Sequence, residues 1–327
     1  MKNYSKHNFD YVVSSISGFT DQVGGELLTK ALMGATTVKE ISNQVGIRGT
    51  QTLNLLDSAP AFQAGSCGWT SSGTTTYTQR NLTVCQEKIN MEWCSDQLRG
   101  TYLSMFLEGG DLDINKQTPF ESVIAQNIVD QVQQRVETKI WQATTAGGDC
   151  FNGLAALMPT TGNSFTAVSV SGTAFNPGIA YGTNGNPIWE VDKLIVALDA
   201  NAQVLDDYKV FMSVPNFRRY VQALTAANYF QNYIGSSNQL GSVSTAYALH
   251  PNSSAKVVPT IGITGNAVYA VPARYTVFGT NLLDDSEKID MFYSRDFDVL
   301  KGLAKYSYGV QVATFGSLKY FATNGLS

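Results

Sequence analysis

One segment constrains the fold of this chain more than any other, residues 118–146, with the sequence TPFESVIAQNIVDQVQQRVETKIWQATTA. Thr118, Pro119 and Glu121 have the arrangement of a helix start, with a capping box and a proline at the first helical position. Apolar residues then recur mostly every four positions, which is typical of one buried helix face: Phe120, Val123, Ile124, Ile128, Val132, Val136 and Ile140. The pattern predicts a single helix of roughly 40 Å, at about 1.5 Å per residue.

The segment 51–100 predicts a long β-hairpin. Its second half contains a clean two-residue alternation, in which Ile89, Met91 and Trp93 point one way and the polar residues between them point the other. An isolated hairpin is marginally stable in water, because it has no second layer against which to bury its side chains. We therefore expect this hairpin to lie on another surface, most economically on a neighbouring subunit.

The remaining chain predicts short elements of mixed type. We expect a short helix at 26–33 within an otherwise extended segment 1–50, and a domain boundary at the Gly/Asn/Pro-rich stretch 176–187. Residues 187–265 alternate helical and strand patterns, which indicates an α/β lobe with a mixed sheet. Further strands are expected at 165–170, 261–264, 267–271, 289–293, 303–312 and 318–322.

Composition excludes several classes of protein. Hydrophobic residues make up 43% of the 327 positions and charged residues only 15%, so the chain has enough apolar side chains for a core. The net charge is −4 and no Lys/Arg cluster exceeds two residues, which argues against a basic groove for nucleic acid. The polar start and the lack of an 18-residue apolar stretch predict neither signal peptide nor membrane span, and hence synthesis in the cytoplasm.

The residues that most often carry chemistry are scarce. The four cysteines, Cys67, Cys85, Cys94 and Cys150, form no C-x-x-C pair, and in a cytoplasmic chain we expect free thiols packed as small hydrophobes. There is no phosphate-binding glycine loop. Only His7 and His250 are present, so neither a histidine-based triad nor a histidine metal cluster is predicted.

Acidic and aromatic clusters have simpler explanations. Residues 111–115 imitate the start of a calcium loop, but Lys116 replaces its glycine and Ser122 its last glutamate. Two acidic clusters, Asp206-Asp207 and Asp284-Asp285-Glu287, have the residue types of an acid/base pair, but each falls in a predicted turn, where aspartate is common. Trp93 and Trp141 continue apolar patterns and are expected in the core. The sequence therefore predicts no catalytic, cofactor or metal site, and no enzyme.

The order of these elements resembles that of the major capsid proteins of tailed bacteriophages, which have the Hong Kong 97-type fold. The resemblance covers nearly the whole chain and has three local matches. The end of the long helix, residues 139–141, followed by 148–154 (GDCFNGL), is similar to the family's spine helix and the turn after it. Residues 208–216 (YKVFMSVPN) resemble a strand-to-helix step of the axial domain, and 307–312 with 319–321 resemble the closing strands.

The resemblance implies an α+β chain in four parts. Residues 1–50 would form the N-terminal arm and 51–100 the extended hairpin loop. Residues 101–185 with 268–310 would form the peripheral domain, including the spine helix 118–146. Residues 186–267 with 311–327 would form the axial domain.

The resemblance also implies a function. Copies of the chain would assemble into pentamers and hexamers of an icosahedral phage head around double-stranded DNA, without sequence-specific contacts. Portal, scaffolding and decoration proteins are the other expected partners, and the virion is the expected location. Some capsid families cross-link a lysine to an asparagine; Lys88 is a conceivable donor, but no partner asparagine is marked. An encapsulin-like nanocompartment shell, a β-rich surface or glycan-binding protein and an enzyme remain as alternatives.

Overall fold

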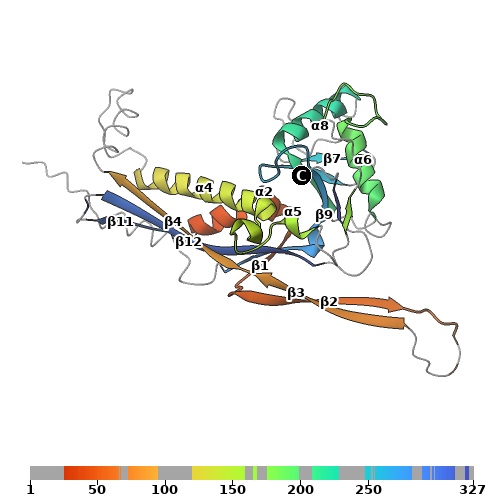
Figure 1. Cartoon of the computed structure of the whole chain (residues 1–327), viewed down its shortest axis with the longest axis horizontal. Coiled ribbons are helices and arrows are strands. Elements are labelled where there is room, and N and C mark those ends of the chain that lie inside the picture. The colour runs from red at the N-terminus through yellow and green to blue at the C-terminus, as the bar shows by residue number, and fades with distance from the viewer. Residues whose placement is uncertain are drawn as a thin grey trace, which may run out of the picture. The chain divides into compact units, whose positions relative to one another are not determined.

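A computed structural model describes residues 26–65, 67, 73–94, 120–158, 165–167, 175–198, 208–227, 247–251, 253, 255–281, 289–294, 297, 299–313 and 321–323 (Figure 1). The chain divides into two compact units. One unit contains residues 1–34, 86–133 and 281–307, and the other contains 35–85, 134–280 and 308–327. Helix α4 (Phe120–Gln142) and strand β12 (Val299–Val312) each contribute residues to both units.

Helix α4 confirms the long helix that the sequence predicts, and Figure 1 shows it as one unbroken coil. The predicted stripe is buried from Ile128 through Val132 and Val136 to Ile140, each at most 2% exposed. The helix ends at Gln142, four residues before the predicted end. The chain tightens there into the 3-10 turn η3 (Thr145–Gly147), and Gly148 has the left-handed φ of 91° that stops a helix. The predicted capping box lies outside the described residues.

The larger unit contains a mixed sheet with the strand order β5-β13-β9-β6-β8-β7 in its described residues. Strand β6 lies at its centre, parallel to β8 and antiparallel to β9. The strands are β5 (Phe165–Ala167), β6 (Tyr208–Ser213), β7 (Ala248–Leu249), β8 (Lys256–Thr260), β9 (Val268–Pro272) and β13 (Phe321–Thr323). Nearly all side chains of β6 and β9 are buried, which confirms the predicted mixed lobe.

Two helices, α6 (Pro187–Ala197) and α8 (Val214–Ala226), pack on this sheet, and a proline stands at the start of each. At α6 the Asn186 side chain accepts hydrogen bonds from the amides of Ile188 and Trp189, both at 3.0 Å. These two amides have no partner within the helix, so the asparagine stabilises its first turn. The stretch 176–187, predicted as a domain boundary, lies within the larger unit and leads into this capped helix.

A second sheet begins in the same unit. Strand β1 (Ser42–Val45) lies parallel to β10 (Thr276–Thr280), and β10 is antiparallel to the end of β12. Helix α2 (Thr36–Glu40) precedes β1, and a 3-10 turn, η4 (Ala273–Tyr275), precedes β10. Residues 26–33 are helical as predicted, but the prediction of an extended chain is wrong for 36–40. Val38 of α2 is fully buried, so tertiary packing fixes this short helix.

In the smaller unit, strands β4 (Cys85–Cys94) and β11 (Ile289–Ser294) pair with β12. The alternation predicted for β4 is confirmed, since residues 86, 88, 90 and 92 are exposed and 87, 89, 91 and 93 are half-buried. The ring of Trp93 lies over Gly302 of β12, with Ile128 of α4 beside it. Trp93 is half-buried, so it packs against the protein but not in the core, where it was expected.

One predicted strand is wrong. Residues 261–264 are not a strand, because β8 ends at Thr260 and the chain turns at Gly265, whose φ is 67°. Strands β11, β12 and β13 lie where strands were predicted. None of the helices in the described part of the chain has the length and apolar character needed to cross a membrane.

Candidate assembly site

The candidate site is a two-stranded ribbon formed by β2 (Thr50–Pro60) and β3 (Gly73–Thr83). The strands pair antiparallel in one unbroken register, from Thr50 opposite Thr83 to Pro60 opposite Gly73, and Figure 1 shows them side by side along their length. At about 3.4 Å per residue the ribbon is roughly 35 Å long. Every β3 residue from 73 to 79 is exposed. Both faces of this part of the strand therefore lack a covering layer among the residues that the structure describes.

The side chains of the ribbon change in character along it. Near the root, hydrogen bonds join opposing polar side chains across one face: Thr50 with Thr83 (3.2 Å), Thr52 with Asn81 (3.2 Å) and Gln79 with Asn54 (3.1 Å). Further out on the same face, Leu56 lies opposite Tyr77. These two side chains are 54% and 79% exposed, and Phe62, just beyond β2, is 97% exposed. The outer ribbon thus presents apolar groups to solvent.

The root of the ribbon is packed into the larger unit. Leu53 and Leu82 of the ribbon belong to a buried apolar cluster with four residues from outside it, Ile47, Val84, Val277 and Ala313. The Gln311 side chain of β12 donates a hydrogen bond to the Asn81 carbonyl at 2.7 Å. The backbone of the ribbon also passes very close to Gly309, where a Cβ atom would lie 2.0 Å from the Thr83 carbonyl oxygen.

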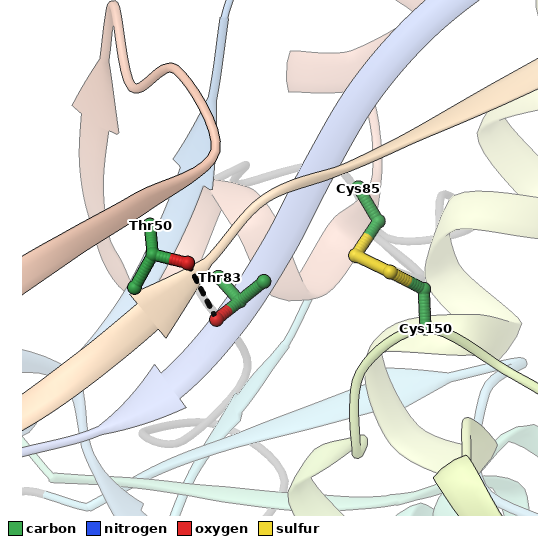
Figure 2. The surroundings of a disulfide bond; sticks show 4 residues. All are labelled: Thr50, Thr83, Cys85 and Cys150. Carbon is green, nitrogen blue, oxygen red and sulfur yellow. Dashed lines mark hydrogen bonds between the residues drawn. A yellow bond between two sulfur atoms is a disulfide. The ribbon is translucent and has the colours of Figure 1, made fainter.

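A disulfide joins Cys85 to Cys150 next to this root (Figure 2). Cys85 is the first residue of β4, two residues after the end of the ribbon, and Cys150 lies in the turn that follows α4. The two are 65 residues apart in sequence. In the chain-entropy model, a loop of this length gives about 4 kcal/mol of stabilisation by restricting the unfolded chain.

The prediction of free, packed thiols is therefore wrong for Cys85 and Cys150. Sequence spacing carries no sign of this pair, because only the fold brings the strand start and the helix turn together. Cys67 is a free thiol, but it is exposed rather than packed, so that part of the prediction is also wrong. The side chain of Cys94 lies outside the described residues.

A buried carboxylate joins three segments of the larger unit. Glu137 of α4 is 1% exposed and accepts hydrogen bonds from the Thr37 amide (3.0 Å) and from the hydroxyls of Thr37 and Thr260. Trp141 donates its indole N–H to the Thr37 hydroxyl at 2.8 Å. The carboxylate thus holds α2 and the end of β8 to α4. Glu137 was not singled out in the sequence, although its position four residues before Trp141 places it beside the buried stripe.

His250 also has a structural environment that the sequence did not reveal. In the tautomer with the proton on Nε2, it donates to Asp192 (2.7 Å) and accepts at Nδ1 from the Tyr220 hydroxyl (2.9 Å). Burial, together with the negative charge of Asp192, raises the pKa of Tyr220 well above 10.0. Tyr220 is fully buried, so no substrate reaches its oxygen. The arrangement fastens α6, α8 and the end of β7 to one another.

Other candidate residues are scattered. Lys88 lies exposed on β4. His7, the imitation of a calcium loop and the acidic clusters at 206–207 and 284–287 lie outside the described residues. Within the part of the chain that the structure covers, no three His, Cys, Asp or Glu side chains are grouped to hold a metal ion.

Comparison with known proteins bears on the fold. No protein-family model and no curated protein sequence matches this chain. Among solved structures, it is similar to the capsid of an empty GTA particle, with a TM-score of 0.55, 10% identity and 88% of both chains covered. It is also similar to a chain of the satellite phage P4 procapsid, which includes the size determination (Sid) protein. There the TM-score is 0.54 at 9% identity, covering 91% of this chain and 98% of the other. The chain has the Hong Kong 97-type fold of phage capsid proteins.

A third similar structure, from Mycobacterium phage Bobi, has a TM-score of 0.50 at 10% identity over 88% of this chain and 89% of that one.

In this Hong Kong 97-type chain, α4 is the predicted spine helix and the ribbon β2–β3 lies in the predicted extended loop. The division into arm, loop, peripheral and axial parts stays a prediction. Sequence identities near one in ten explain why only the layout of elements, and no sharp motif, pointed to this fold.

Proposed function

We propose that this chain is the major capsid subunit of a tailed bacteriophage, which assembles into pentamers and hexamers of an icosahedral head around double-stranded DNA. The observation that carries the proposal is the ribbon β2–β3. The outer part of β3 is exposed on both faces, and Tyr77 on this strand forms an exposed apolar pair with Leu56 opposite it. A surface of this kind gains free energy only when another molecule covers it.

The covering surface in this proposal is a neighbouring copy of the same chain. A ribbon of roughly 35 Å, at about 3.4 Å per residue, reaches well beyond its own root. Interfaces of standard size bury about 1,600 Å² in total, and a ribbon with an N-terminal arm, residues 1–50, would add to the contact between compact domains. Because each subunit of a closed shell is held at several contacts at once, modest pairwise free energies are sufficient.

The contacts at the root suit a ribbon that docks on a neighbouring subunit. A docked ribbon transmits force only if its root is fixed, and this root is held by an apolar cluster, a disulfide and the close contact at Gly309. In the same proposal, residues 101–185 with 268–310 form the peripheral domain and 186–267 with 311–327 form the axial domain that meets its copies around the capsomer axis.

The charge distribution fits a shell that binds the enclosed DNA only weakly. The net charge is −4, and several lysines are paired within the chain: Lys139 with Asp149, Lys256 and Lys209 with Glu40, and Lys193 with Glu190. Lysines neutralised in this way release few counterions from DNA, so binding should be weak and should depend little on salt. A capsomer whose affinity for double-stranded DNA falls steeply with salt would contradict this part of the proposal.

Electron microscopy of the purified chain tests the main proposal. The chain is concentrated alone and in a bacterial lysate, and both samples are imaged in negative stain. We expect closed shells, tubes, or rings with five-fold and six-fold symmetry. Nuclease-protected double-stranded DNA inside particles produced during infection would support the phage head. Monomers in both samples at high concentration would contradict assembly, and shells filled with a specific enzyme would contradict the genome container.

A further inference from the structure

We propose that the Cys85–Cys150 disulfide is a redox-controlled clamp on the root of the ribbon, closed after the subunit has folded and assembled. The timing rests on the proposed function, which places synthesis in a bacterial cytoplasm. Thiols in that compartment are kept reduced by glutathione and thioredoxin, so a structural disulfide closes there only after release.

The disulfide lies where the two strands of the ribbon join the rest of the chain, at Gly49 and Val84, and this junction is called the hinge below. Only Val84 lies between the end of β3 at Thr83 and the start of β4 at Cys85. The other strand enters the ribbon through Gly49, whose φ of 72° is a conformation that favours glycine. The Val84 amide donates to the Gly49 carbonyl at 2.7 Å and joins the two sides of the hinge. The disulfide is one residue away from this hydrogen bond.

The turn that carries Cys150 is formed by contacts that do not need the disulfide. Asp149 pairs with Lys139 of α4 and accepts a hydrogen bond from the Thr144 amide at 3.0 Å. Asn152 accepts from the Thr145 amide at 2.8 Å. These local bonds shape the turn that carries Cys150 without any contribution from the covalent link.

The position of Cys85 is likewise fixed by contacts other than the disulfide. Its neighbour Val84 is 7% exposed and packs in the apolar cluster at the root of the ribbon. Both thiols are therefore presented by structure that forms without them. The bridge can open and close within one fold, which is the property a switch requires.

The exposure of the two cysteine residues suggests the order of the reaction. Cys150 is exposed, whereas Cys85 is only 7% exposed. The Cys150 thiolate attacks a low-molecular-weight disulfide, RSSR, forming a mixed disulfide and releasing one RS⁻. The Cys85 thiolate then attacks the Cys150 sulfur, closes the bridge and releases the second RS⁻. In total, two protein thiols are oxidised and one RSSR is reduced to two RSH.

Hydrogen exchange of the full-length chain tests the clamp. Peptides that contain the Val84 amide are followed by mass spectrometry in the oxidised chain and after reduction with a phosphine. Closing the bridge should slow exchange at Val84 by about tenfold or more, because the hinge hydrogen bond then opens less often. Cys150→Ser should exchange at the fast rate under both conditions, and Cys67→Ser, which keeps the bridge, should behave as wild type.

A second measurement fixes the timing. Thiols are alkylated at the moment of cell lysis and again in purified particles, and the alkylated fraction of Cys85 and Cys150 is compared. We expect alkylation at lysis and protection in particles. A bridge already complete at lysis, equal exchange in the oxidised and reduced chains, or unfolding of the reduced chain would each overturn the clamp. Redox-dependent exchange at Val84 in a chain that never forms particles would refute the capsid function and leave the hinge mechanism intact.

Discussion

Replacing Tyr77 by alanine should weaken assembly without weakening the fold. Tyr77 is 79% exposed in the isolated chain and lies opposite Leu56 on the outer ribbon. Its side chain touches little of its own subunit, so the free energy of unfolding should change by less than about 0.5 kcal/mol. If a neighbouring copy covers this side chain in the assembled state, the whole loss falls on association.

The size of that loss follows from the exposed area. A covered aromatic side chain buries about 150–250 Å², and with 79% of it still exposed in the free chain, roughly 120–200 Å² remains to be buried. At about 25 cal/mol per Å² this corresponds to about 3–5 kcal/mol. Ordering of the side chain lowers it to about 2–4 kcal/mol per contact. The dissociation constant of one contact should therefore rise by about 30- to 700-fold.

The assay compares three chains over a range of concentrations. Light scattering and sedimentation give the concentration at which particles form for wild type, Tyr77→Ala and Thr78→Ala, while thermal unfolding checks each fold. Thr78 is the matched control, because it is the next residue of β3, is also exposed and points to the opposite face of the ribbon. An unchanged assembly threshold in Tyr77→Ala, or an equal shift in both variants, would refute docking through the Leu56–Tyr77 pair.

Three further predictions concern the anchors. Glu137→Ala should lower the free energy of unfolding, measured by denaturant titration, by at least about 3 kcal/mol. The substitution leaves the buried donors of Thr37 and Thr260 without an acceptor. Glu137→Gln retains one acceptor oxygen, so its free energy of unfolding should fall less. Gly309→Ala should cost about 3 kcal/mol by thermal unfolding, because its Cβ meets a carbonyl oxygen at 2.0 Å, while Gly65→Ala, with open space around it, should be near neutral. Stability should fall above about pH 10, because Tyr220 ionises in the unfolded chain while its raised pKa keeps it protonated in the folded one. Chemical unfolding from pH 9 to 11 should show a shallower decline in Tyr220→Phe than in wild type.

The candidate site could be predicted in outline but not in its contacts. A hairpin was expected over 51–100 from alternation and turn composition, and its need for a covering partner from the weakness of isolated hairpins. The hairpin exists, but it ends at Thr83, and the prediction is wrong for the strand with the clearest alternation, β4, which pairs with β12 of the same chain. Which residues stay exposed depends on the depth to which the ribbon enters the core. The cluster around Leu53 and Leu82 ends before Leu56, so the apolar pair beyond it remains on the surface. Sequence periodicity carries no information on that depth.

Local chemistry determined the elements that the sequence specified correctly. Four-residue spacing in α4, two-residue alternation in β4 and prolines at the starts of α6 and α8 act between near neighbours in the chain, so they are readable before folding. Tertiary structure alone decided the rest. Cys85 meets Cys150 across 65 residues, Glu137 meets Thr37 across 100, and His250 meets Asp192 across 58. No local pattern records these pairs, because each arises only when separately formed segments pack together and their buried polar groups require partners.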